Sequence, residues 1–132
     1  MKYLVDTNIV IFVLKDQERE LARRLATVPA REVALSSVVE AELYHGAEKY
    51  AQPEQRRETL DGFLAPYRRL AFDSLCVPHY ARIRHQLEKA GQVIGTNDLL
   101  IAATALAHDL TVVTHNGGEF RRVPGLKVED WV

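Results

Sequence analysis

An apolar helix and an apolar strand follow one another in the segment from Asn97 to Thr114. Leucine, isoleucine and alanine fill most positions from 99 to 107, and a short β-branched run occupies 111–114. Such elements are stable only when they are buried, so both are expected in the interior of the fold. Asp98 lies in the first turn of the helix and Glu119 lies just beyond the strand. A fold that closes here therefore places two acids near one edge of a sheet.

Short apolar runs alternate with helical patterns along the rest of the chain. The bulky run at 3–5 is typical of a strand buried on both faces, and it stops at Asp6. We expect strands at 3–5, 32–36, 70–72, 111–114 and 126–128, helices at 38–50, 53–64, 78–90 and 97–109, and two short helices or one broken helix between 9 and 28. This alternation favours an α/β fold with a parallel sheet covered by helices on both faces.

The polar residues between these elements predict how the helices begin. Thr7 or Asn8 is expected to cap the first helix and Ser37 the helix after the second strand, because their side-chain oxygens accept from free backbone amides. The polar stretch from His115 to Glu119 is expected to be a loop.

The size of the chain suits one domain spanning residues 1–132. It has 132 residues, of which 47% are hydrophobic and 27% charged. The apolar stretches end well before the roughly 20 residues that a membrane span requires, and no signal peptide precedes the first strand. Cys76 is the single cysteine, which excludes an internal disulfide framework and suits a reducing cytosol. We therefore expect a cytoplasmic protein without a membrane segment.

The net charge of −1 gives no general basic signature for nucleic acid. This total conceals a second arrangement, because four acids gathered in one pocket would leave the rest of the protein positive. Paired arginines could then form a basic rim, or they could be scattered and solvated; they stand at 23–24, 56–57, 68–69 and 121–122. The sequence leaves both readings open.

Acids occur where the carboxyl ends of parallel strands and the amino ends of helices are expected to meet. Asp6 ends the first strand, Glu119 follows the strand at 111–114, and Asp98 begins the helix before that strand. Glu42 could join them from one turn inside the third helix, although Glu40 competes equally by spacing. Each acid alone has a simpler explanation; Asp98, for example, would be stabilised by the helix dipole by about 0.3–1 kcal/mol.

Several carboxylates in one pocket would require a cation. Two carboxylates about 4 Å apart repel by roughly 4 kcal/mol at an effective dielectric constant of 20. All-oxygen ligation suits Mg²⁺ or Mn²⁺, which keep water in their coordination shell and are bound partly by substrate phosphates. The implied chemistry is phosphodiester cleavage, with the metal ion lowering the pKa of a water and stabilising the leaving oxygen.

Other chemistries find less support in the sequence. Gly117-Gly118 lacks the following lysine and the strand-to-helix context of a phosphate-binding loop. The five histidines show no paired metal spacing, and Cys76 with His79 lacks a second pair, so zinc is not expected. No nucleophile-elbow pattern surrounds any serine.

Four ordered motifs resemble the PIN-domain ribonucleases, specifically the VapC toxins of type II toxin-antitoxin modules. The matching residues are Leu4-Val5-Asp6-Thr7-Asn8, then Ser36-Ser37 with Ala41-Glu42-Leu43-Tyr44-His45-Gly46-Ala47, then Gly95-Thr96-Asn97-Asp98-Leu99-Leu100-Ile101-Ala102-Ala103, and Val113-Thr114-His115-Asn116 with Glu119-Phe120. The resemblance covers essentially the full chain. It implies a PIN-like three-layer sandwich with a mostly parallel central sheet of four to five strands flanked by helices.

The resemblance also implies roles for particular residues. It selects Glu42 over Glu40, because the family glutamate precedes a leucine and stands four residues before a glycine. Asp6, Glu42 and Asp98 become the catalytic trio that holds Mg²⁺ or Mn²⁺. Glu119 takes a fourth acidic position, in contact with the metal directly or through water. The residues implied to support this site are Thr7, Asn8, Thr114 and Asn116.

Members of this family cleave RNA, often a tRNA, usually act as homodimers, and are neutralised by a VapB antitoxin. The segment from Gly46 to Glu54 is similar to the subgroup that cuts initiator tRNA in its anticodon loop. We therefore expect a metal-dependent endoribonuclease toxin with an RNA substrate and an antitoxin partner. Two alternatives are a Mg²⁺-binding receiver-like signalling domain and a catalytically silent PIN-like binding module.

Overall fold

The computed structural model describes all 132 residues, Met1–Val132. The elements are β1 (Tyr3–Val5), α1 (Thr7–Leu14), α2 (Arg19–Thr27), a short 3-10 helix (Ala30–Glu32), β2 (Val33–Ser36), α3 (Ser37–Ala47), α4 (Pro53–Leu64), β3 (Arg68–Leu70), α5 (Val77–Lys89), α6 (Thr96–Ala107), β4 (Thr111–Val113), α7 (Gly117–Phe120) and β5 (Val128–Glu129). None of the helices has the length and apolar character needed to cross a membrane.

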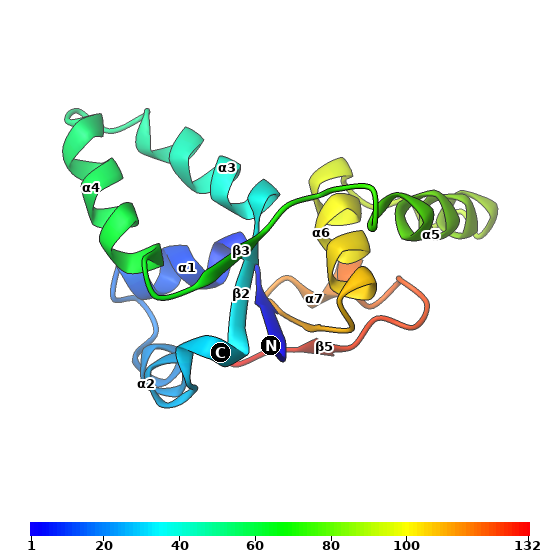
Figure 1. Cartoon of the computed structure of the whole chain (residues 1–132), viewed down its shortest axis with the longest axis horizontal. Coiled ribbons are helices and arrows are strands. Elements are labelled where there is room, and N and C mark those ends of the chain that lie inside the picture. Colours follow the sequence, from blue (N-terminus) through cyan, green and yellow to red (C-terminus); the bar gives the residue numbers. More distant parts are fainter.

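The five strands form one parallel sheet in the order β3-β2-β1-β4-β5. Figure 1 shows α1 to α4 on one side of this sheet and α5 to α7 on the other. The three-layer α/β sandwich predicted from the sequence is confirmed. The chain leaves β1 toward β2 in one direction and returns to place β4 on the other side of β1. The carboxyl ends of β1 and β4 therefore border the topological switch point, where open parallel sheets form their binding crevices.

Buried residues are concentrated in the central strands of the sheet and in the helix α6. The side chains of Leu4, Val112 and Phe120 are fully buried. Small residues such as Ala102 and Ala103, also fully buried, allow α6 to pack closely against its neighbours. Thr104 is the buried polar residue of α6, and its hydroxyl is satisfied by donating to the carbonyl oxygen of Leu100 over 2.8 Å. The apolar segment that begins after Asp98 is thus buried, as expected.

Two helices begin earlier than the sequence predicts, because the strand passes into the helix without a loop. Asp6, rather than Thr7 or Asn8, is the N-cap of α1, and its Oδ1 accepts from the backbone N–H of Thr7 over 2.8 Å. Ser36, rather than Ser37, caps α3 by accepting from the N–H of Val39 over 3.1 Å. The end of each strand therefore also starts the next helix.

Two further expectations were wrong in position. The third strand lies at Arg68–Leu70, not at 70–72, because this edge strand exposes two arginines that hide its pattern. The expected loop 115–119 contains part of a helix, α7, which buries Phe120 completely. That helix turns the segment after β4 back toward the start of α6, and so determines where Glu119 lies.

Candidate active site

Four acids from four different elements approach one another at the carboxyl edge of the sheet. Asp6 follows β1, Glu42 lies on α3, Asp98 lies in the first turn of α6, and Glu119 lies on α7. These carboxylates interact electrostatically: the charges of Asp6, Glu119 and Glu42 all raise the pKa of Asp98. The structure therefore brings together all four acids named from the sequence, beside the switch point.

Asp6 is the most buried of the four acids, with 6% of its surface exposed. Besides the bond from the Thr7 N–H to Oδ1, its Oδ2 accepts from the hydroxyl of Thr114 over 2.9 Å. Thr114 itself is fully buried at the end of β4. Burial raises the pKa of Asp6, the bonds from Thr7 and Thr114 oppose that effect, and the charge of Glu119 adds to it. The start of α1 thus orients one oxygen of Asp6, and the residue after β4 orients the other.

Glu42 is linked to Asp6 through a single residue. The hydroxyl of Thr7 donates to Oε1 of Glu42 over 3.1 Å, so Thr7 serves both acids, one with its backbone and one with its side chain. Burial raises the pKa of Glu42, the bond from Thr7 lowers it, and the charge of Asp6 raises it. Glu40 instead lies 3.9 Å from the guanidinium Nε of Arg69, in a surface ion pair. The structure therefore places Glu42, and not Glu40, beside Asp6, a choice that spacing alone left open.

Asp98 and Glu119 form a hydrogen-bonded pair at the amino end of α6. Burial, the hydrogen bond to Glu119 and the charges of the neighbouring acids together raise the pKa of Asp98 to about 8. The same bond lowers the pKa of Glu119. Glu119 Oε1 also accepts from the backbone N–H of Gly95 over 3.2 Å. In this pair Asp98 therefore holds a proton more readily than Glu119, and Glu119 also contacts the helix start through Gly95.

The donor set has the chemistry of a site for a hard divalent cation. All of its groups are carboxylates, and three of them have raised pKa values because burial and neighbouring negative charge disfavour ionisation. With the side chains as they stand, no three acidic, imidazole or thiol groups surround one point closely enough to hold an ion. In this arrangement the hydroxyl groups of Thr114 and Thr7 donate to Asp6 and Glu42, and Asp98 and Glu119 are hydrogen-bonded to each other.

The predicted supporting residues lie around the acids in different ways. Thr7 and Thr114 contact the carboxylates directly. The side-chain oxygen of Asn8 accepts from the N–H of His115 over 3.4 Å, which joins α1 to the segment after β4. Asn116 contributes its backbone, whose N–H donates to Oγ1 of Thr114 over 2.9 Å. Thr114 therefore accepts one hydrogen bond while it donates the other to Asp6.

Two contributors were not singled out as site residues from the sequence. Gly95 offers its backbone N–H to Glu119, and the side chain of Asn97 bonds to Glu42 and lowers its pKa. Asn97 immediately precedes Asp98, and Gly95 stands three positions before it, in a Gly-Thr-Asn-Asp run at the helix start. That run was the available signal, since unpaired amides and small polar residues gather at helix amino ends.

Comparisons with known proteins agree with this fold. A model of the PIN domain matches residues 3–126. The chain therefore belongs to the PIN domain family. Among curated relatives, it is 38% identical over 132 residues to Ribonuclease VapC2 of Rickettsia felis, covering 99% of this chain and 98% of that one. It is 35% identical over 131 residues to the tRNA(fMet)-specific endonuclease VapC of Salmonella typhimurium, with 99% and 98% covered.

A solved structure gives the same answer for the fold. DNA-bound VapBC from Salmonella typhimurium superposes with a TM-score of 0.93 at 35% identity, covering 100% of this chain and 99% of that one. The receiver-like alternative is wrong, because receiver domains have the strand order 2-1-3-4-5, whereas this sheet has the order 3-2-1-4-5.

Proposed function

We propose that this protein is an endoribonuclease toxin that hydrolyses phosphodiester bonds in RNA with the help of Mg²⁺ or Mn²⁺. The observation that carries the proposal is the meeting of four carboxylates from β1, α3, α6 and α7 at the switch point. Curated relatives that match the full chain are named ribonucleases and endonucleases. A silent binding module is disfavoured, because it would have no use for buried acids that raise one another's pKa values.

Asp6, Glu42 and Asp98 would hold the metal ion, and Glu119 would hold Asp98 and the start of α6 in place. A bound divalent ion supplies an activated water and charge stabilisation at the phosphate. Thr114 and Thr7 fix the direction in which the oxygens of Asp6 and Glu42 point. Charge neutralisation by the cation would replace the proton between Asp98 and Glu119.

The substrate and the partner follow from the relatives. The relatives from Salmonella typhimurium and Shigella flexneri, 35% and 36% identical, are named for tRNA(fMet). We therefore propose tRNA as the substrate, with the initiator tRNA anticodon loop as the first target to test. Solved VapBC complexes at 35–36% identity support a VapB-like antitoxin as the neutralising partner. We further propose a cytoplasmic homodimer, because tRNA is cytoplasmic and the family is usually dimeric.

The decisive experiment compares the cleavage of total tRNA by the wild type and by an Asp98→Asn variant in the presence of Mg²⁺. The substitution keeps the shape of the side chain but removes its charge, and cleavage is expected to fall by at least about 100-fold. Asp73→Asn is the matched control, because Asp73 lies in the exposed turn before α5. Addition of EDTA to the wild type should stop cleavage as well. Wild-type cleavage by Asp98→Asn would refute the assignment.

A further inference from the structure

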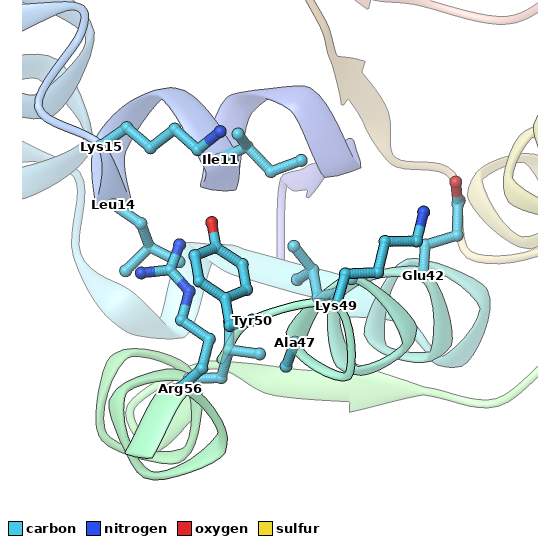
Figure 2. Close-up of a pocket in the computed structure, with 11 residues that line it drawn as sticks. Ile11, Leu14, Lys15, Glu42, Ala47, Lys49, Tyr50 and Arg56 are labelled. Atoms are coloured by element: carbon cyan, nitrogen blue, oxygen red, sulfur yellow. The ribbon is translucent and has the colours of Figure 1, made fainter. Parts of the chain in front are cut away.

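A cavity of about 230 Å³ lies between α1, α3 and α4, next to the acid cluster. Figure 2 shows this groove with Glu42 at one end and Arg56 at the other. Its walls include the apolar side chains of Leu14, Leu43 and Leu60. Glu42 is at once a member of the acid cluster and a lining residue of the groove. The groove is therefore continuous with the proposed active site.

Three cations face this groove and form no ion pair within the protein. They are Lys15 at the end of α1, Lys49 just after α3, and Arg56 on α4. The neighbouring Arg57, by contrast, forms an ion pair with Glu48. Against the three cations the groove carries the single acid Glu42. The groove is therefore positively charged and ends at the negatively charged acid cluster.

An aromatic surface lies among these cations. Tyr50 lines the groove with 43% of its surface exposed, and the guanidinium carbon of Arg56 lies 4.6 Å from the centroid of its ring. A tyrosine with an arginine stacked on it offers flat faces to a nucleobase, and apolar walls beside it tolerate any base. The combination of aromatic face, cations and apolar wall matches single-stranded nucleic acid.

We propose that this groove binds an unpaired nucleotide of the RNA substrate next to the bond that is cut. Lys15 and Lys49 contact the phosphates, while Tyr50 and Arg56 stack on the base. The inference rests on the proposed function, since the acid cluster at its end must be the cleavage site. The volume of about 230 Å³ is below the roughly 300–1,000 Å³ of typical small-molecule pockets, which suits one base rather than a duplex.

The first test measures cleavage by a Lys49→Ala/Arg56→Ala double variant on an RNA stem-loop with an unpaired loop. KM is expected to rise about tenfold while kcat stays within about twofold, because the groove positions substrate and does not touch the reacting atoms. Lys89→Ala/Arg31→Ala is the matched control; both of these cations are exposed, unpaired and remote from the groove. It should keep the wild-type KM.

The second test measures binding without cleavage, by fluorescence anisotropy of the labelled stem-loop in EDTA. In the Lys49→Ala/Arg56→Ala variant, loss of the phosphate contact of Lys49 should lower the slope of log affinity against log salt by about 0.7 for a single strand. Tyr50→Ala should weaken binding by about tenfold, whereas Tyr50→Phe, which keeps the ring, should bind as the wild type does. A purely structural role of Tyr50 would also lower the thermal stability of Tyr50→Ala, so the proposal requires that this variant unfold at the wild-type Tm while binding RNA more weakly.

The outcomes distinguish the two proposals. If the wild type cleaves the RNA and the double variant has the KM and the salt slope of the control, the groove assignment is wrong and the proposed function stands. If the wild type does not cleave RNA, the proposed function fails, and the groove proposal with it. If the double variant keeps wild-type RNA affinity but no longer binds its co-expressed antitoxin, the groove belongs to a protein partner and the proposal is overturned.

Discussion

The hydroxyl of Thr114 donates to Oδ2 of Asp6 over 2.9 Å, although the two residues are 108 positions apart in the chain. The bond connects the carboxyl ends of β1 and β4, the two strands that border the topological switch point. Thr114 also accepts from the N–H of Asn116. One buried threonine therefore fixes both the most buried acid and the direction of the segment that leads to Glu119.

Replacing Thr114 with valine should remove both hydrogen bonds at nearly constant volume. Because it leaves Oδ2 of Asp6 and the N–H of Asn116 without partners, the free energy of unfolding should fall by about 1–3 kcal/mol. The rate of cleavage should fall by more than the smaller fraction of folded protein explains, since Asp6 loses its orientation. Urea denaturation and tRNA cleavage measure the two effects. Thr114→Ser keeps the hydroxyl and should retain most activity; equal losses in Ser and Val variants would contradict this account.

Glu119 acts on α6 from outside the helix. The N-cap of α6 is Gly95, which has no side chain to cap the helix, and Glu119 accepts its backbone N–H instead. Glu119→Ala should therefore cost about 0.5–2 kcal/mol of stability, as the loss of a helix cap does. Glu119→Gln keeps the accepting oxygen and should cost less. Chemical denaturation of the two variants would show it; identical unfolding free energies would leave Glu119 without this role.

Much of the fold could be predicted from the sequence, because its central elements are uniform in character. The apolar stretches 3–5 and 99–107 favour burial, and most of their residues are buried in the structure. Acids at the ends of such elements are expected near the sheet edge, so position predicted where Asp6 and Asp98 lie, but their assignment as metal ligands came from the family resemblance. The choice of Glu42 over Glu40 needed the family resemblance, since both lie on the same helix and spacing cannot orient it.

Other features depend on contacts that a single sequence does not encode locally. α7 forms because Phe120 is drawn into the core, and only tertiary packing determines that. The bond between Asp98 and Glu119 depends on rotamers and on a shared proton. The positive groove is built from the ends of α1, α3 and α4, so Lys15, Lys49 and Arg56 become neighbours only when these helices pack.

The tight packing of α6 predicts a difference between its buried and its partly exposed alanines. Ala103 is fully buried, whereas Ala107 at the last position of the helix is half-buried. Ala103→Leu should lower the free energy of unfolding by about 1–3 kcal/mol, because the added atoms have no space. Ala107→Leu is the matched control with the same change in volume and should cost much less. Thermal unfolding checks both, and equal shifts in Tm would contradict the packing described.

The raised pKa of Asp98 couples stability to pH. Its carboxyl group is protonated in the folded state up to about pH 8 but ionises near pH 3.8 in the unfolded chain. The folded state therefore binds more protons between these values, so this group's contribution to stability is present below about pH 4 and is lost as the pH rises toward 8. The bond that lowers the pKa of Glu119 acts in the opposite sense at acidic pH.

Removal of divalent ions should therefore destabilise the protein most at alkaline pH. In EDTA, Tm should fall between pH 5 and pH 8, since Asp98 must ionise among three other acids. Mg²⁺ should raise Tm more at pH 8 than at pH 5, because it binds the ionised carboxylates and stabilises by about 2.7 kcal/mol at 100 times its Kd. Asp98→Asn should flatten the pH dependence and weaken the response to Mg²⁺. Thermal unfolding in Mg²⁺ and, separately, in EDTA measures the pH dependence of Tm and the response to Mg²⁺. A Mg²⁺ effect on Tm that is equal at pH 5 and pH 8 would show that these acids do not bind the ion.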